Sequence, residues 1–340
     1  MITREPDFGN MLKVMRREVP DRPVLFELFM NYPLYELVVG HKLEGDTALD
    51  RSRFVVEAFA KMGYDYAHVV GSSFGFPTGH HPHLQTSSLN DGSVIVDRES
   101  YEKYVWPDPE DTSFDHLREI RPYLPDGMKL MVLGPGGVLE NAISLMGYDR
   151  LCYLLSDDPE LVHLVFDQIG SRLLSYYRLA LQHDTVGLIS ANDDWGFNTQ
   201  TFLSPAQMRE YVLPWHAKIV ELSHKHGRPV FLHSCGQLIT VMDDVIAMGF
   251  DAKHSFEDVI LPIEEAYEKW HSRIALLGGL DMNFVCTRPP EEVYARARGM
   301  LERSETRGGY ALGTGNSIPE YVPVKAFFEI IRAATGEVPL

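Results

Sequence analysis

Apolar and polar positions alternate along this chain in a repeating rhythm. Short apolar runs, bounded by glycine, proline or polar residues, are followed by longer segments in which apolar residues recur every three or four positions. The first pattern is typical of buried strands and the second of amphipathic helices. The apolar runs lie at residues 22–30, 64–70, 129–137, 186–195, 228–235, 250–256, 274–281 and 309–315.

Local signals refine this outline at several positions. Residues 8–19 predict an amphipathic helix that leads into the first strand, and Ser204-Pro205 is a typical helix start. Residues 138–182 hold two helical stretches in succession, so the third crossover is enlarged. Asn90-Asp91-Gly92 lies between alternating segments within residues 84–97, which predicts a β-hairpin inserted after the second strand.

Eight strands that alternate with helices predict an α/β fold, specifically a (β/α)₈ TIM barrel. A doubly wound parallel sheet is the alternative, because both folds share the alternation. The boundaries of the second and sixth strands are the least sharply defined. We expect residues 1–340 to form a single barrel domain, because barrels reach this length as one unit and the sequence contains no low-complexity linker.

Composition argues against several classes of binding partner and against a membrane or secreted location. The formal net charge of −17 argues against nucleic acid or an anionic membrane surface, since both are polyanions. No apolar run approaches the roughly 20 residues of a membrane-spanning helix. The stretch MITREPDFGN lacks an apolar segment, so we expect no signal peptide, and the three cysteines form no disulfide framework. A cytoplasmic location is therefore expected.

Polar and titratable residues gather where the predicted strands end. In barrel enzymes, catalytic groups lie at the C-terminal ends of the strands. The residues at these ends are Glu27, Gly136-Gly137, Asp193-Asp194-Trp195, His233, Cys235, His254, Glu257, Asp281 and Thr314-Gly315-Asn316. This distribution is expected of a functional site.

His233 and Cys235 give the most specific chemical signal. Residues i and i+2 of a strand project to the same face, so an imidazole nitrogen and a sulfur converge on one point. Zinc binds this pair of donors well. The alternative is a small buried thiol beside a core histidine. A third ligand is left open, the candidates being Cys286, Asp281, His254, Glu257 and Asp193.

Weaker signals lie elsewhere. The three histidines within residues 80–83 are interpreted as part of a surface loop rather than as a metal site. The glycine-rich turn at residues 134–137 lacks the lysine and spacing of a phosphate-binding loop, which favours close backbone packing. Trp195 and Tyr32 suit either an aromatic-lined pocket or the core.

These stretches resemble the uroporphyrinogen decarboxylase superfamily, from about residue 20 to the end of the chain. The resemblance rests on residues 193–220, on HSCG at residues 233–236, on GGLDM at residues 278–282 and on LGTGNSIP at residues 312–319. The family fold is a (β/α)₈ barrel, which agrees with the strand count.

Where this chain departs from the family pattern, the differences indicate which branch of the superfamily it resembles. True uroporphyrinogen decarboxylases carry arginines just after the first strand and an aspartate after the second. Here residues 26–37 contain no arginine, and serines stand near the aspartate's place. In such a site, the carboxylates of a polycarboxylate substrate would lack ion-pair partners. A metal-free decarboxylase of a smaller acid, and a barrel that binds a tetrapyrrole or corrinoid without turnover, remain alternatives.

The other branch is similar to the zinc-dependent methyltransferases that work with methylated corrinoid proteins. Its His-x-Cys pair matches His233 and Cys235, and we add His254 as a further metal ligand. Its third ligand is a cysteine in a Gly-Cys-Gly segment, where this chain has Thr314. The sequence lacks an Asp-x-His-x-x-Gly corrinoid motif, so the resemblance implies a corrinoid carried by a partner protein.

The leading hypothesis is therefore a zinc-dependent methyltransferase that moves a methyl group between a corrinoid and a small substrate, either a thiol or a methoxy or methylamine compound. Barrels of this family often pair, so a homodimer is expected. The residues predicted to act in catalysis are Asp193, Glu257 and Asn316, and those predicted to contact substrate are Trp195, Glu27, Tyr32 and Asp281.

Overall fold

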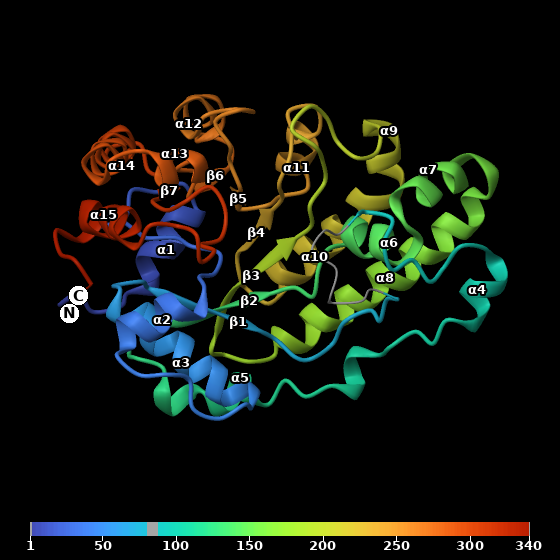
Figure 1. Cartoon of the computed structure of the whole chain (residues 1–340), viewed down its shortest axis with the longest axis horizontal. Helices are drawn as coiled ribbons and strands as arrows, with labels where there is room; N and C mark the ends of the chain where they lie inside the picture. Colours follow the sequence, from blue (N-terminus) through green and yellow to red (C-terminus); the bar gives the residue numbers. More distant parts are fainter. Residues whose placement is uncertain (1, 80–87, 340) are drawn as a thin grey trace.

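The computed structural model describes residues 2–79 and 88–339, and within them a curled sheet of seven parallel strands follows the order of the chain (Figure 1). Each strand pairs with the next one in sequence, so every crossover returns to the neighbouring position. The strands are β1 (Tyr66–Val70), β2 (Lys129–Leu133), β3 (Val186–Asn192), β4 (Val230–His233), β5 (Ala252–His254), β6 (Ala275–Leu277) and β7 (Tyr310–Ala311). The fold is α/β and resembles a TIM barrel, as the alternation predicts.

The first predicted strand, residues 22–30, forms isolated bridges instead of a continuous ladder. Leu25 pairs with Leu312 and Met30 with Ile318, both in the parallel sense, so the segment lies beside β7. On its other side the hydroxyl of Tyr66 in β1 replaces strand pairing. It accepts from the Glu27 N–H at 2.8 Å and donates to the Glu27 carbonyl at 2.5 Å. A side chain thus occupies the place of a backbone ladder.

Helices cover the outside of the sheet, which explains why most strand residues are apolar and buried. The helical segments are α1 (Phe8–Met15), α2 (Tyr32–Val39), α3 (Ala48–Lys61), α4 (Arg98–Lys103), η1 (Pro109–Asp111), α5 (His116–Glu119), η2 (Arg121–Tyr123), α6 (Val138–Met146), α7 (Tyr148–Asp157), α8 (Pro159–Ala180), α9 (Pro205–Gln207), η3 (Met208–Val212), α10 (Leu213–Lys225), α11 (Met242–Ala247), α12 (Ile263–Trp270), α13 (Met282–Thr287), α14 (Pro290–Ser304) and α15 (Val324–Thr335). Among the described residues, none of these helices has both the length and the apolar character needed to cross a membrane.

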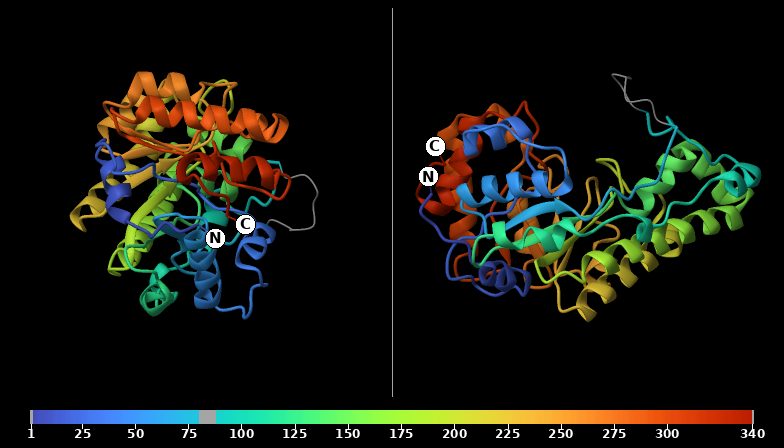
Figure 2. Two further views of the ribbon diagram at one scale, coloured as in Figure 1. Left: turned by 90° about the vertical axis from the view of Figure 1, so that its left-hand side faces the viewer. Right: turned by 90° about the horizontal axis from the view of Figure 1, so that it is seen from below.

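The enlarged third crossover consists of α6, α7 and α8 between β2 and β3. These helices, drawn in green, project to one side of the sheet (Figure 2). Asp158 separates α7 from α8 and accepts the Leu161 N–H at 3.1 Å, which caps α8. The same carboxylate accepts two hydrogen bonds from Arg98, at 2.7 and 2.6 Å, and so ties α4 to the crossover.

The predicted β-hairpin after the second strand is not confirmed. Residues 80–87, which include the three histidines of that loop, lie outside the described residues. Residues 88–97 contain no strand. Asn90-Asp91-Gly92 does form a turn, but the N–H groups of Val94 and Ile95 both donate to the Leu145 carbonyl at 2.8 Å. The apolar alternation of this stretch therefore packs against the end of α6 instead of a partner strand.

Register places the C-terminal ends of β3, β4 and β5 at one level. Asn192 of β3 pairs with His233 of β4, and His233 pairs with His254 of β5. Because alternate residues along a strand face opposite sides, this register decides which side chains beyond each strand end share a face.

Glu27, predicted to contact substrate, is instead buried in the core beside Thr314. Its carboxyl accepts the Thr314 N–H at 2.8 Å, and its other oxygen lies 2.5 Å from the Thr314 hydroxyl. That hydroxyl also lies 2.7 Å from the carbonyl of Asn316, which can only accept. The single hydroxyl proton points to Asn316, so Glu27 supplies the proton of the shorter contact and is a neutral acid. In agreement, burial raises the pKa of Glu27 to about 8.

We predict that Glu27→Gln changes the pH dependence of stability. The folded protein holds a proton on Glu27 that the unfolded chain releases above its ordinary pKa of 4.5, so the free energy of unfolding of the wild type falls as pH rises from there to about 8. Glutamine keeps both hydrogen bonds and has no such proton. In urea unfolding, the free energy of unfolding of the variant should rise relative to that of the wild type as pH increases across this interval. The relative increase should be at most about 1.4 kcal/mol per pH unit. Parallel pH profiles would contradict a buried neutral acid.

Candidate functional site

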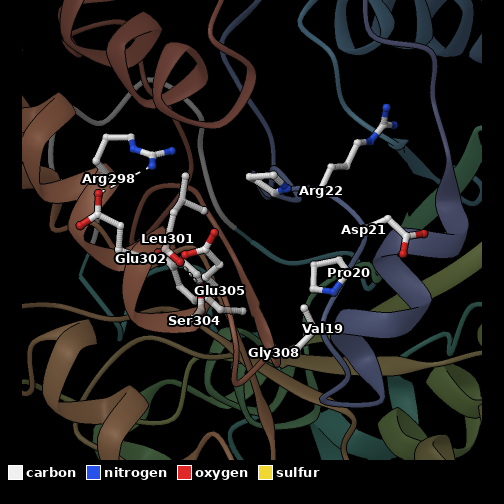
Figure 3. Close-up of a pocket in the computed structure, with 12 residues that line it drawn as sticks. Val19, Pro20, Asp21, Arg22, Arg298, Leu301, Glu302, Ser304, Glu305 and Gly308 are labelled. Atoms are coloured by element: carbon white, nitrogen blue, oxygen red, sulfur yellow. Dashed lines mark hydrogen bonds and ion pairs between the residues drawn. The ribbon is translucent and has the colours of Figure 1, made fainter.

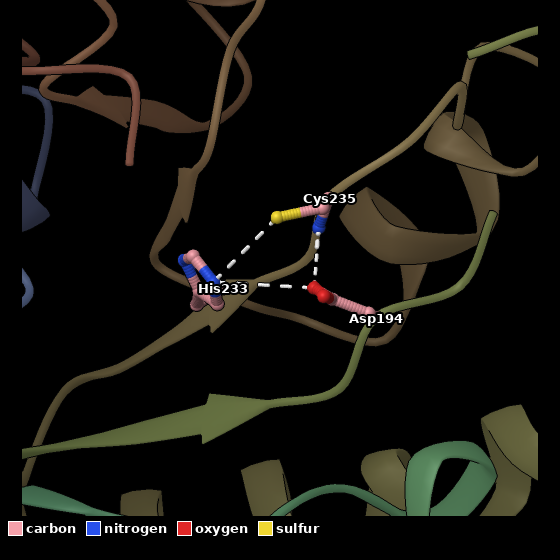
Figure 4. Close-up of side chains that lie close together, drawn as sticks. All are labelled: Asp194, His233 and Cys235. Atoms are coloured by element: carbon pink, nitrogen blue, oxygen red, sulfur yellow. Dashed lines mark hydrogen bonds and ion pairs between the residues drawn. The ribbon is translucent and has the colours of Figure 1, made fainter. Parts of the chain in front are cut away.

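Side chains from the ends of β3 and β4 converge at the C-terminal edge of the sheet (Figure 4). Nε2 of His233 lies 3.9 Å from Sγ of Cys235 and 3.9 Å from Oδ1 of Asp194. We name these three residues the triad, and their donor atoms all lie within 4.8 Å of one another. The structure thus brings together the two residues of the His-x-Cys motif and adds a carboxylate, forming a possible metal site.

Asp194 belongs to this possible metal site, and the sequence reasoning missed it in favour of Asp193. Asp193 is fully buried and faces the opposite way: its carboxylate accepts the N–H groups of Leu139 and Glu140 at 3.0 and 2.9 Å and contacts Nε2 of His216 at 2.8 Å. It therefore anchors the start of α6 and lies outside the triad. Asp194 lies level with Cys235 and accepts its N–H at 2.8 Å. Strand alternation, combined with the register, is the signal that distinguishes the two aspartates.

The glycine-rich turn before α6 follows from the same packing. A Cβ on Gly137 would lie 2.0 Å from the Cβ of Asp193, so only glycine allows the helix start to approach that carboxylate. The close backbone packing expected of this turn is what the structure shows.

Two polar groups outside the triad contact the Cys235 sulfur. The Asn316 amide donates to Sγ at 3.4 Å, and the Ser255 hydroxyl lies 3.7 Å away. The carbonyl of the Asn316 side chain accepts the Ser317 N–H at 2.8 Å, so both ends of this amide are engaged. Burial, and then the charge of Asp194, raise the pKa of the Cys235 thiol to about 12. The thiol is therefore protonated at neutral pH when no cation is bound.

Lys253 is a second residue that the sequence reasoning missed. Its ammonium is buried and donates to the backbone carbonyls of Ser255 and Ser234. Burial lowers its pKa to about 8, opposed by the neighbouring Cys235 and Asp194. A lysine at the centre of a predicted strand was the available signal, because such a group is rarely buried without partners.

His254, predicted as a metal ligand, lies behind His233 and does not face the triad. Its Nδ1 is 2.8 Å from Nδ1 of His233, and its Nε2 is 3.1 Å from the carbonyl oxygen of Thr314. Burial is the main cause that lowers the pKa of His233 to about 4 and holds the pKa of His254 well below its usual value. Both imidazoles are therefore neutral at physiological pH.

Glu257 and Asp281 line a cavity of about 700 Å³ at the mouth of the sheet, together with Asn316 and Cys286. Asp281 accepts the N–H groups of Phe284 and Asp258 at 2.8 and 2.9 Å, so its carboxylate is held by the backbone. Burial, and then Asp281, raise the pKa of Glu257. This acidic cavity adjoins the triad through Asn316, which contacts the Cys235 sulfur.

The two aromatic residues predicted to contact substrate lie apart from the triad. Trp195 is fully buried and packs edge-to-face against His216, with ring centroids 5.1 Å apart. Tyr32 begins α2 and stacks on Phe54 of α3, with ring centroids 6.1 Å apart. It borders a separate cavity on the outer side of β1, near His68. Trp195 is therefore part of the core, whereas Tyr32 is 41% exposed at the edge of that cavity.

A further pocket, shown in Figure 3, lies at the other edge of the sheet, where the strands begin. It is lined by residues that precede the first predicted strand and by residues of α14, with Tyr310 of β7. Its guanidinium groups already have partners: Arg22 pairs with Asp65 at 2.6 Å and Arg298 with Glu302 at 3.6 Å. Chemistry at the triad does not involve this pocket.

Known proteins share this fold and sequence pattern. A methyltransferase from Methanosarcina mazei superposes with a TM-score of 0.68 over 96% of this chain and 97% of its own, at 15% identity, a likeness of fold. Uroporphyrinogen decarboxylases of Anaeromyxobacter sp. (strain Fw109-5) and Burkholderia thailandensis are 25% and 23% identical over 228 and 239 residues.

Those alignments cover 64% of this chain, and they span 62% and 61% of the two relatives. The sequence model of the family described as "Uroporphyrinogen decarboxylase (URO-D)" matches residues 66–336, which include every strand of the sheet and the whole triad. The chain therefore belongs to the uroporphyrinogen decarboxylase family.

Proposed function

We propose that this protein is a zinc-dependent methyltransferase that moves a methyl group between a small substrate and a corrinoid carried by a partner protein. The observation that carries the proposal is the convergence of Asp194, His233 and Cys235 within 4.8 Å at the C-terminal ends of β3 and β4. One nitrogen, one sulfur and one oxygen donor match the ligands that zinc accepts, and three protein ligands leave a position for substrate, as in catalytic zinc sites. The methyltransferase neighbour in fold is consistent with this branch of the family.

In this proposal Asp194 is the third ligand. The family cysteine is replaced by Thr314, whose hydroxyl lies between Glu27 and the Asn316 carbonyl, at 2.5 and 2.7 Å. That side chain is engaged away from the triad. A carboxylate is a better zinc ligand than a hydroxyl, and Asp194 already lies beside both other donors.

The residues around the triad suit a bound cation. When bound there, zinc would supply a Lewis acid that activates the methyl acceptor or the leaving group. The Asn316 amide holds the Cys235 sulfur by hydrogen bonding, at 3.4 Å. The cavity with Glu257 and Asp281 would receive the small substrate beside them. The corrinoid would arrive on a partner, because the 340 residues contain no corrinoid-binding motif of the family type.

Decarboxylation of a polycarboxylate fits this cavity poorly. Among the described residues, its lining includes Glu257 and Asp281 and no arginine or lysine. A substrate rich in carboxylates would be desolvated against like charges, which costs free energy without compensating ion pairs. A neutral or cationic methyl compound, or a thiol, meets no such repulsion.

We predict that the purified protein contains about one zinc per chain and that the triad residues are needed to hold it. Asp194→Asn and Cys235→Ala should each lower zinc affinity by roughly 100-fold or more, because the first removes the negative charge of a ligand and the second removes a ligand outright. Elemental analysis and chelator competition measure this.

Two matched controls accompany these variants. Asp193→Asn should keep zinc and lose about 1–3 kcal/mol of stability, since it weakens the anchor of α6. Cys286→Ala should also keep zinc, because this thiol lines the cavity and is outside the triad. Loss of zinc in either control, or its retention in Cys235→Ala, would refute the ligand assignment.

The pH dependence of zinc affinity forms another prediction. Without metal, Cys235 has a pKa of about 12 and His233 a pKa of about 4, so metal binding displaces a proton from the thiol and none from the imidazole. The dissociation constant should therefore fall about tenfold per pH unit between about pH 6 and 9. Chelator competition, corrected for the chelator's own protonation, measures the slope. A flat profile would exclude a thiolate ligand.

The reaction itself is tested by parallel assays. With methylcobalamin and a panel of thiols, we expect a matching thiol to convert methylcobalamin to cob(I)alamin. With reduced cob(I)alamin and panels of methoxy compounds and methylamines, we expect a matching donor to form methylcobalamin. The visible spectrum follows both changes. Cys235→Ala should reduce the rate by about a hundredfold or more, because it removes a metal ligand. Release of carbon dioxide from a carboxylic acid panel, without methyl transfer, would support the decarboxylase alternative.

A further inference from the structure

His254 is a fully buried imidazole that lies between a carbonyl and another imidazole. Its Nε2 is 3.1 Å from the Thr314 carbonyl oxygen, and its Nδ1 is 2.8 Å from Nδ1 of His233. A carbonyl oxygen can only accept, so His254 carries a proton on Nε2. The same oxygen also accepts the Gly279 N–H at 2.9 Å, which holds it in place.

The proton on Nε2 of His254 determines where His233 carries its own proton. The ring of His254 packs edge-on against Phe26, with centroids 4.9 Å apart, and no carboxylate contacts it among the described residues. Burial without a counter-charge favours the neutral ring, which has a single proton. Its Nδ1 is then an acceptor, and His233 must donate its own Nδ1–H.

This arrangement leaves the Nε2 lone pair of His233 facing the triad. Nε2 lies 3.9 Å from Sγ of Cys235 and 3.9 Å from Oδ1 of Asp194. Without the bond to His254, the nearby carboxylate would favour a proton on Nε2, because a negative charge attracts the N–H dipole. That tautomer could not act as a metal ligand through Nε2.

We infer that His254, aligned by the Thr314 carbonyl, is a positioning residue that holds His233 in the Nδ1–H tautomer and presents its Nε2 lone pair to the triad. The inference rests on the proposed metal site for its purpose, but the tautomer itself is a property of the metal-free protein. Thr314, which stands at the position of the family cysteine, contributes its main-chain carbonyl oxygen to this arrangement.

Two further features maintain this contact. The N–H and hydroxyl of Thr314 are bound by Glu27, and the Gly315 N–H, which shares a peptide plane with the Thr314 carbonyl, donates to the Leu280 carbonyl at 2.7 Å. Gly278 has a φ of 65°, and a Cβ there would lie 2.1 Å from the Thr314 oxygen and 3.1 Å from Nε2 of His254. Only glycine leaves room for the imidazole to reach the carbonyl.

The direct test is nitrogen NMR of isotopically labelled histidine in the metal-free wild type at neutral pH, with His233 assigned by difference from His233→Ala. We expect Nδ1 of His233 to be protonated and Nε2 to show the shift of a bare lone pair. An Nε2–H tautomer, or an even mixture of the two, would overturn the inference. This measurement requires neither a bound metal nor a variant of His254.

Variants then test whether His254 causes the preference. His254→Leu removes the acceptor, and His233 should shift toward the Nε2–H tautomer. His254→Gln offers an amide that donates to Thr314 and a carbonyl that accepts from His233, so it should restore the Nδ1–H tautomer. The control His116→Leu removes another buried imidazole, bonded to the Val70 carbonyl at 2.9 Å, and should leave His233 unchanged. Unchanged His233 signals in His254→Leu would contradict the assigned role.

Zinc affinity gives a second readout. His254→Leu should weaken zinc binding by about 10–100-fold and His254→Gln should recover most of the loss, as for other groups that orient a metal-binding histidine. Cobalt(II) bound to the Cys235 sulfur gives a charge-transfer band, and this band should persist in both variants. Its persistence would show that the site is intact and that the weaker binding comes from misorientation of His233. If the wild type binds no zinc or cobalt, the proposed function fails, whereas the tautomer measurement still decides this inference.

Discussion

The level register of β3, β4 and β5 is the constraint on which the site depends. Asn192, His233 and His254 pair across neighbouring strands, so the residues beyond each strand end leave the sheet at the same height. A shift of one residue in any of these pairings would turn the side chains to the opposite face. It would separate His233 from His254 and replace Asp194 with Asp193 beside Cys235. The hydrogen-bonding pattern of the backbone thus selects which polar groups can meet.

Burial gives these groups their chemical character. Inside the mouth of the sheet, the thiol of Cys235 is held in its neutral form and His233 is kept unprotonated, because charges are poorly solvated there. Burial also lowers the pKa of Lys253, which lies close to the sulfur and to Asp194, to about 8. Donors with available lone pairs, near a carboxylate and beside an acidic cavity, are the groups that make up the possible metal site.

Closure of the sheet and organisation of the site share one chain of hydrogen bonds. Tyr66 binds both backbone groups of Glu27, whose carboxyl binds Thr314. The Thr314 carbonyl in turn meets His254, which meets His233. The segment that forms no continuous ladder with β1 is therefore fixed by side chains that also reach the triad. A displacement of the segment at residues 22–30 would therefore change the orientation of the His233 imidazole, because each hydrogen bond in the chain orients the next group.

The sequence by itself determined what depends on local periodicity. Seven of the predicted strands are present. His233, the last residue of β4, meets Cys235 two positions further on, as the period of two along an extended chain predicts. The tertiary structure alone decided between Asp193 and Asp194, since adjacent residues face opposite ways and only strand pairing says which way is inward. It also placed His254 behind His233 and packed Val94 and Ile95 against α6 instead of in a hairpin. These outcomes depend on partners distant in sequence, about which a local pattern carries no information.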